Sequence, residues 1–105
     1  MSAMTELLRE RLLAREGVTS GPSTLAKTTA FFAGGEELAH FHGDDEIDVR
    51  LPPRHQRDYV TRGPVRPRPH PSPWIAIRFE SEADVELALE MFDRARAALD
   101  EEASA

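Results

Sequence analysis

The chain has 105 residues, 40% of them hydrophobic and none of them cysteine, which suits one domain with a single core and excludes disulfides, thiolate nucleophiles and cysteine-ligated zinc. Its net charge of −6 does not offer the broad cationic face that nucleic acids require. No apolar run approaches the roughly 20 residues that span a membrane, and the start lacks the pattern of a secretory signal, so we expect a soluble, cytoplasmic protein without membrane or nucleic-acid partners.

Apolar residues at helical spacing lie near the start of the chain. Met4, Leu7, Leu8 and Leu12 recur every three or four positions with charged residues between them, which predicts an amphipathic helix. Gly17 is a suitable stop for that helix. The stretch TSGPS that follows has the composition of a loop.

Three segments then predict an antiparallel meander. The run TLAKTTAFFA is rich in β-branched and aromatic residues and should be a strand that ends at the turn formed by Gly34 and Gly35. ELAHFHG should be the second strand and EIDVRL the third, because its apolar and polar residues alternate. Proline cannot donate to a sheet ladder, so Pro52 and Pro53 end the third strand, and a short helix can begin there.

Prolines and arginines dominate the next stretch. PVRPRPHPSP holds five prolines in ten residues, which fix φ and remove amide donors, so we expect an extended segment without regular hydrogen bonding. Six arginines fall within residues 49–70 and are opposed there only by Asp58. This local excess of positive charge suits a small anion better than a duplex.

The last strand and helix have the clearest patterns. In WIAIRFE, Trp74, Ala76 and Arg78 fall on one face of a strand. Ser81 can cap the following helix, with Asp84 three positions later. An apolar stripe along that helix consists of Val85, Ala88, Leu89, Phe92, Ala95 and Leu99. Residues 101–105 should fray.

The order of these elements, α-β-β-β-α-β-α, predicts one α+β domain over residues 1–105. We expect a four-stranded, mainly antiparallel sheet packed on one face by the N- and C-terminal helices. The other face of such a sheet is open to solvent and carries polar side chains.

The stretch HFHGDDEIDVRL brings two histidines close to an acid and an arginine. A hairpin that buries one face needs an odd number of loop residues here, and the three residues 44–46 satisfy this requirement. The predicted opposite pairs are His42 with Asp48, Phe41 with Val49, His40 with Arg50 and Ala39 with Leu51. His40, His42, Asp48 and Arg50 should then project from the same side of the sheet.

Four interpretations of this polar quartet stay open. Two histidines at i and i+2 can ligate a metal, but Arg50 would place a permanent cation beside it. In general acid–base catalysis, a histidine would be the base, Asp48 would orient it and Arg50 would stabilise negative charge, although no nucleophile motif is nearby. The third interpretation is a site for an anion or small ligand, joined by His70. The fourth is a set of cross-strand pairs that only solubilise the sheet.

Trp74 has two interpretations of its own. It either packs beside the helices or, because strand alternation turns it away from Ile75 and Ile77, lies on the same side as the histidines. In the second case it would form an aromatic wall, which ligand pockets commonly have.

Several of these segments resemble the small bacterial luciferase-domain family. The similarity covers residues 25–99 and is carried by ELAHFHGDDEIDVRLPP, RPRPHPSPWIAIRF and EADVELALEMFDRAR. Its most specific parts are the His-x-His pair, the DVRLP strand end and the His-Pro segment before Trp74. The resemblance implies no particular reaction and transfers no catalytic residue. It implies that one surface is formed by His40, His42, Asp48, Arg50, His70 and Trp74.

We therefore expect a domain that binds a small anionic or polar ligand at the His/Arg face of its sheet. The ligand-binding residues would be His40, His42, Asp48, Arg50, His70 and Trp74, without a metal ion. A small histidine-dependent enzyme is one alternative. A protein–protein interaction module that uses the same face, including a homo-oligomer, is another. The sequence identifies neither the ligand nor a cofactor.

Overall fold

The computed structural model describes residues 2–104 and has the predicted α+β class. Its elements are, in order, α1 (Ala3–Leu13), β1 (Val18–Pro22), β2 (Thr29–Ala33), β3 (Glu36–Phe41), β4 (Glu46–Arg50), α2 (Pro53–Gln56), β5 (Val65–Arg66), β6 (Trp74–Arg78) and α3 (Glu82–Ser104). In this described part of the chain, no helix is long and apolar enough to cross a membrane.

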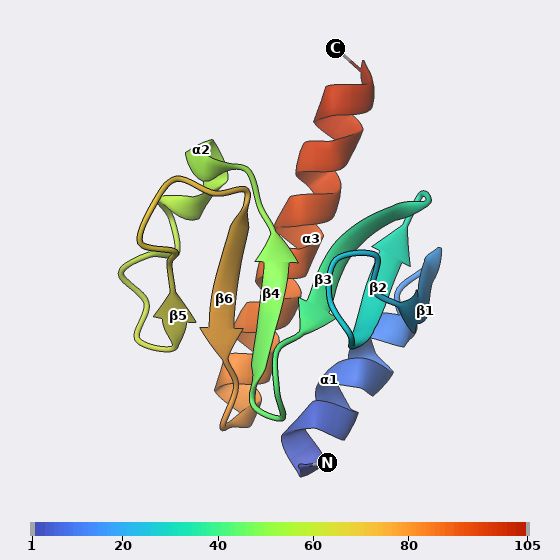
Figure 1. The fold of residues 1–105 in the computed structure, drawn as a ribbon, viewed down its shortest axis with the longest axis vertical. Helices are drawn as coiled ribbons and strands as arrows, with labels where there is room; N and C mark the ends of the chain where they lie inside the picture. The colour runs from blue at the N-terminus through green and yellow to red at the C-terminus, as the bar shows by residue number, and fades with distance from the viewer. Residues whose placement is uncertain (1, 105) are drawn as a thin grey trace.

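The sheet is wider than predicted. Within residues 2–104 it has six strands in the order β1-β2-β3-β4-β6-β5, and neighbouring strands pair antiparallel. The predicted strands form its centre as β2, β3, β4 and β6. The mainly antiparallel sheet is thus confirmed, and the prediction of four strands is wrong. The two additional strands, β1 and β5, lie at opposite edges of the sheet (Figure 1).

Both additional strands contain residues that disfavour a strand in the middle of a sheet. β1 includes Gly21 and Pro22, and β5 lies between Pro64 and Pro67. An edge strand pairs on one side only, so a proline there need not donate to a ladder. The carbonyl of Pro64 still accepts a hydrogen bond of 2.9 Å from the backbone N–H of Arg78. The stretches predicted as loop and as unpaired segment are therefore partly strand.

Helices α1 and α3 lie behind the sheet as Figure 1 draws it, so the helices pack on one face as predicted. Large apolar side chains such as Phe31, Ile77 and Phe92 are fully buried between these layers. The opposite side of the sheet, which we call the open face, carries most of the polar side chains discussed below. The strand predicted from residue 24 begins only at Thr29, and residues 23–28 instead form a loop that crosses the open face (Figure 1).

The β3–β4 hairpin has the predicted loop length but another register. The observed opposite pairs are Ala39 with Val49, His40 with Asp48 and Phe41 with Ile47. This register differs by two residues from the predicted one, in which His40 faced Arg50. Because a shift of two keeps every side chain on its face, the open face still holds the predicted polar residues, but their partners change.

Gly43 accounts for the observed register. The N–H of His42 donates to the carbonyl of Glu46 at 2.8 Å, which leaves residues 43–45 as the three-residue loop. Gly43 begins this loop with a φ of 76°, in the left-handed region that glycine adopts without steric cost. The predicted loop, one residue later, left Gly43 in the strand.

Gly43→Ala should lower the free energy of unfolding by about 1 kcal/mol. No atom lies within 4 Å of the position that a Cβ would occupy, so the cost comes from the backbone conformation alone. Gly63→Ala is the matched control, because Gly63 also has open space around it and is not among the glycines with positive φ. Urea denaturation of both variants measures the difference. Equal stabilities of the two variants would show that the conformation of Gly43 does not require glycine.

Helix α3 begins as predicted. Ser81 Oγ accepts a hydrogen bond from the N–H of Asp84 at 3.3 Å, and Asp84 Oδ2 accepts one from the N–H of Glu80 at 3.0 Å. The predicted apolar stripe belongs to the core, with Leu99 at its partly buried end.

The helix also continues beyond residue 100, where we expected fraying. It is helical to Ser104, and Glu101 lies 3.7 Å from Arg54 and 3.8 Å from His55 in ion pairs that link this end to α2. Ala105 lies outside the described residues.

Candidate ligand-binding face

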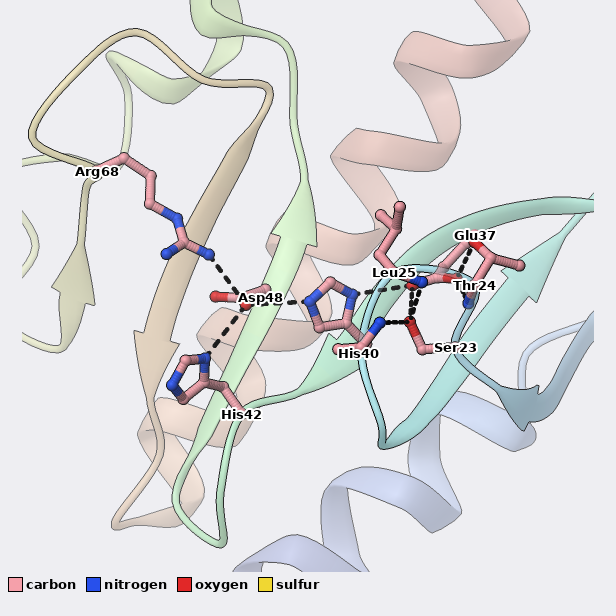
Figure 2. Close-up of polar contacts among 9 residues, drawn as sticks. Ser23, Thr24, Leu25, Glu37, His40, His42, Asp48 and Arg68 are labelled. Carbon is pink, nitrogen blue, oxygen red and sulfur yellow. Dashed lines mark hydrogen bonds and ion pairs between the residues drawn. The ribbon is translucent and has the colours of Figure 1, made fainter.

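Three ionisable side chains are buried in a row on the open face. Glu37 is 9% exposed, His40 7% and Asp48 2%. Glu37 and His40 come from β3 and Asp48 from the neighbouring β4, and Figure 2 shows the imidazole between the two carboxylates. Buried charges are tolerated only when they are paired and hydrogen-bonded, so the hydrogen-bond partners of each group determine whether it is charged.

Both ring nitrogens of His40 form hydrogen bonds with carboxylates. Nδ1 lies 2.9 Å from Oε2 of Glu37, and Nε2 lies 3.1 Å from Oδ2 of Asp48. An ionised carboxylate can only accept, so both nitrogens donate and the imidazole is cationic. The hydrogen bond with Asp48 raises the pKa of His40, burial opposes this, and the hydrogen bond with Glu37 adds to the rise.

Three basic side chains lie close to one carboxylate oxygen of Asp48. Its Oδ2 lies 3.1 Å from Nε2 of His40, 3.1 Å from Nη2 of Arg68 and 3.6 Å from Nδ1 of His42 (Figure 2). Its Oδ1 has no hydrogen-bond partner among the described residues. Burial by itself raises the pKa of Asp48, but the hydrogen bond from His40 and the charge of Arg68 outweigh burial, and the pKa is lowered. The carboxylate is therefore charged at neutral pH.

Glu37 belongs to this site, although the alternation of side chains along a strand predicts that it lies on the opposite face of the sheet. Strict alternation places residues three apart on opposite faces of a strand, so Glu37 and His40 should point away from each other. The pairing of β3 with β2 skips Leu38, which is therefore an extra residue in β3. Such a bulge reverses the alternation and turns Glu37 to the open face.

The loop of residues 23–28 is held by the same carboxylate. Ser23 Oγ donates to Oε2 of Glu37 at 2.7 Å, and the N–H and the hydroxyl of Thr24 donate to Oε1 at 2.8 and 3.0 Å. Burial raises the pKa of Glu37, but the hydrogen bonds from Ser23, Thr24 and His40 outweigh burial, so that this pKa is lowered too. Figure 2 shows the loop lying over β3 at this point.

Arg50 lies apart from these ion pairs. It stands opposite Trp74 of β6, and it has no hydrogen bond or ion pair within residues 2–104. The predicted pair of His40 with Arg50 is therefore wrong, because the register is shifted. Arg68, from the proline-rich segment, is the arginine that binds Asp48. The sequence did not single out Arg68, because the fold of that segment against β6 decides which arginine reaches the sheet.

Trp74 lines a pocket and does not pack beside the helices. Its ring lies 4.7 Å from the ring of His40, tilted by 44°. Beside it the open face has a hollow of about 250 Å³, which we call the Trp74 hollow. It is lined by Thr24, Leu25, Phe32, Glu37, Arg50 and Trp74, and the hairpin turn at Gly35 and Glu36 completes it.

The remaining predicted residue, His70, does not join this arrangement. It is exposed and has no hydrogen bond or ion pair in the described part of the chain. The structure thus brings together His40, His42 and Asp48, places Trp74 against His40, and puts Arg50 next to Trp74.

The two histidines differ in what they can do chemically. His40 cannot accept a proton from a bound molecule while both nitrogens donate to carboxylates. The side chain of His42 is 63% exposed and has its Nδ1 turned to Asp48, so it is the histidine that a molecule on the open face can contact. Within residues 2–104, no group of three His, Asp or Glu side chains is arranged to hold a metal ion.

Comparison with known proteins identifies the family. The model of the luciferase domain matches residues 35–95, more than half of the chain, and this match includes β3, β4, β6 and most of α3. None of the curated proteins and none of the solved structures compared with the chain matches it. The chain belongs to the luciferase-domain family.

Proposed function

We propose that this domain binds a small anionic or polar ligand at the open face, in the Trp74 hollow, with Arg50 as its charge partner. The observation that supports this proposal is the position of Arg50 and its lack of an acidic partner among the described residues. Arg50 is half-buried and lines the hollow. Other arginines of the open face are paired, Arg68 with Asp48 and Arg78 with Asp45.

A guanidinium without a partner is suited to an anion. It presents several N–H donors in a rigid plane, and two of them match the two oxygens of a carboxylate or phosphate group. Partial burial removes some of its water, so a ligand anion competes with less solvent there than at a fully exposed arginine.

The buried row beside the hollow gives this site its shape. The imidazolium of His40 supports one side of Trp74, and Glu37 holds the loop that forms the opposite wall. In this proposal His40, Glu37 and Asp48 position the walls, whereas Arg50 and Trp74 contact the ligand.

Arg50→Gln should weaken the binding of small anions at least tenfold. A hydrogen bond to a charged group contributes about 1.5–3 kcal/mol, and about 1.4 kcal/mol corresponds to a tenfold change in Kd. Isothermal titration calorimetry with inorganic phosphate, acetate, benzoate and adenosine monophosphate measures the effect. Arg57→Gln is the matched control, because it removes the same charge from an exposed arginine outside the hollow.

Two results would contradict the proposal. One is equal affinity of the parent and Arg50→Gln for an anion that binds. The other is the absence of binding by all four anions, whose meaning a change in the molecular mass of Arg50→Gln in sedimentation would then specify. Such a change in mass would instead support an interaction module that uses the same face.

A further inference from the structure

Three of the residues that line the Trp74 hollow have large apolar side chains, which a site for an inorganic anion would not need. Trp74 and Phe32 contribute aromatic rings from β6 and β2, and Leu25 projects from the covering loop. Leu25 is 64% exposed, well above the other exposed large hydrophobic residues, Leu13 at 40% and Val60 at 39%. Leu25 does not stand alone, because Phe32 and Trp74 line the same hollow, and an apolar part of a ligand would cover these side chains.

The positive charge available to a ligand in this hollow is that of a guanidinium, and the exposed Glu36, which also lines it, carries a carboxylate. Glu37 also lines it, but both of its oxygens already accept hydrogen bonds from Ser23, Thr24 and His40. Arg50 has no such partner within residues 2–104. The hollow thus combines one planar cation without an acidic partner within residues 2–104, the exposed carboxylate of Glu36 and three apolar side chains.

The size of the hollow limits the ligand further. Its volume of about 250 Å³ lies below the roughly 300–1,000 Å³ that sites for drug-sized molecules have. One ring with a short substituent suits this space better than a nucleotide. An inorganic anion would contact Arg50 and leave the apolar walls to water.

We propose that the ligand class of this site is the aromatic monocarboxylate, with the carboxylate on Arg50 and the ring between Trp74, Phe32 and Leu25. The inference rests on the proposed function, since it names the ligand for the same hollow. The carboxylate accepts two parallel hydrogen bonds from the guanidinium, and the ring covers the apolar walls. Leu25 then determines specificity for the ring and not for the charge.

The test compares three kinds of probe by calorimetry on the full chain. Benzoate and phenylacetate carry both features, acetate and inorganic phosphate carry only the charge, and benzyl alcohol carries only the ring. We expect the aromatic carboxylates to bind at least tenfold more tightly than acetate, phosphate or benzyl alcohol. Leu25→Ala should weaken benzoate about threefold to tenfold and leave acetate unchanged, whereas Leu13→Ala, on an exposed leucine of α1, should change neither.

The outcomes separate this inference from the function on which it rests. Binding of phosphate or acetate as tight as that of benzoate would overturn the aromatic ligand class and leave an anion site at Arg50. Binding of benzyl alcohol as tight as that of benzoate would overturn the role of Arg50 in both proposals. Binding of no anion at all would overturn both. An unchanged affinity of Leu25→Ala for benzoate would show that the ring does not occupy the hollow.

Discussion

Asp48→Asn should lower the free energy of unfolding by about 3 kcal/mol, because it removes the charge that three basic side chains share. Asp48 is 2% exposed, and its Oδ2 contacts His40, Arg68 and His42. Asparagine has nearly the same shape and keeps one acceptor oxygen, so the loss measures mainly the charge and not a cavity. The imidazolium of His40 would remain buried with one carboxylate in place of two. Urea denaturation followed by circular dichroism gives the difference.

Asp93→Asn is the control for this prediction. Asp93 also accepts two hydrogen bonds from an arginine, Arg15, at 2.7 and 2.9 Å, but its side chain is 53% exposed. An exposed ion pair contributes about 0–1 kcal/mol, because water screens it. A loss below 1 kcal/mol in Asp48→Asn, equal to that of the control, would mean that the buried row does not stabilise the fold.

Periodicity was sufficient to predict the centre of the sheet and both long helices. Their apolar residues repeat every two or every 3.6 positions because one face of each element is buried. The edge strands β1 and β5 carry no such pattern, since they are short, lie beside prolines and are held through one neighbour only. Tertiary pairing and not local sequence makes them strands.

The candidate site was predictable in its residue types and not in its contacts. Alternation correctly placed His40, His42, Asp48 and Arg50 on one face, and that result survives any even shift of register. Which of these residues lie opposite one another depends on where the hairpin loop begins. A loop that begins at Gly43 places His40 opposite Asp48. The signal available in the sequence was Gly43 itself, because glycine is the residue that most easily adopts the positive φ with which this loop begins.

Glu37 and Arg68 could not be found from alternation. Glu37 reaches the open face through the bulge at Leu38, which sequence periodicity does not mark. Arg68 is one of six arginines in residues 49–70, and only the course of the chain beside β6 brings it to Asp48. Both missed residues carry a charge opposite to that of the group they bind, so charge balance in the buried row was the constraint that the pattern left out.

The buried row also makes the stability of the protein depend on pH. The pKa of His40 is raised, so its contribution to stability is complete below the ordinary histidine value of about 6.5 and is lost as the pH rises through the folded-state value. The pKa values of Glu37 and Asp48 are lowered, so their contributions are complete above about 4.3 and are lost as the pH falls through the folded-state values. The row therefore stabilises the fold most between about pH 4.3 and 6.5.

His40→Gln should remove the decrease in stability on the alkaline side of this range. In the parent, the free energy of unfolding should fall above pH 6.5 by up to about 1.4 kcal/mol per pH unit, because the unfolded chain releases a proton that the folded chain retains. Glutamine can still donate to a carboxylate but does not titrate, so the variant should be less stable near pH 6 and nearly independent of pH from 6.5 to 8.5. His70→Gln removes an exposed histidine without a partner in residues 2–104 and should keep the parental slope. Urea denaturation at half-unit pH intervals measures all three proteins. A parent whose stability is constant from pH 6.5 to 8.5, or a His40→Gln variant that keeps the slope, would mean that His40 is not a buried imidazolium.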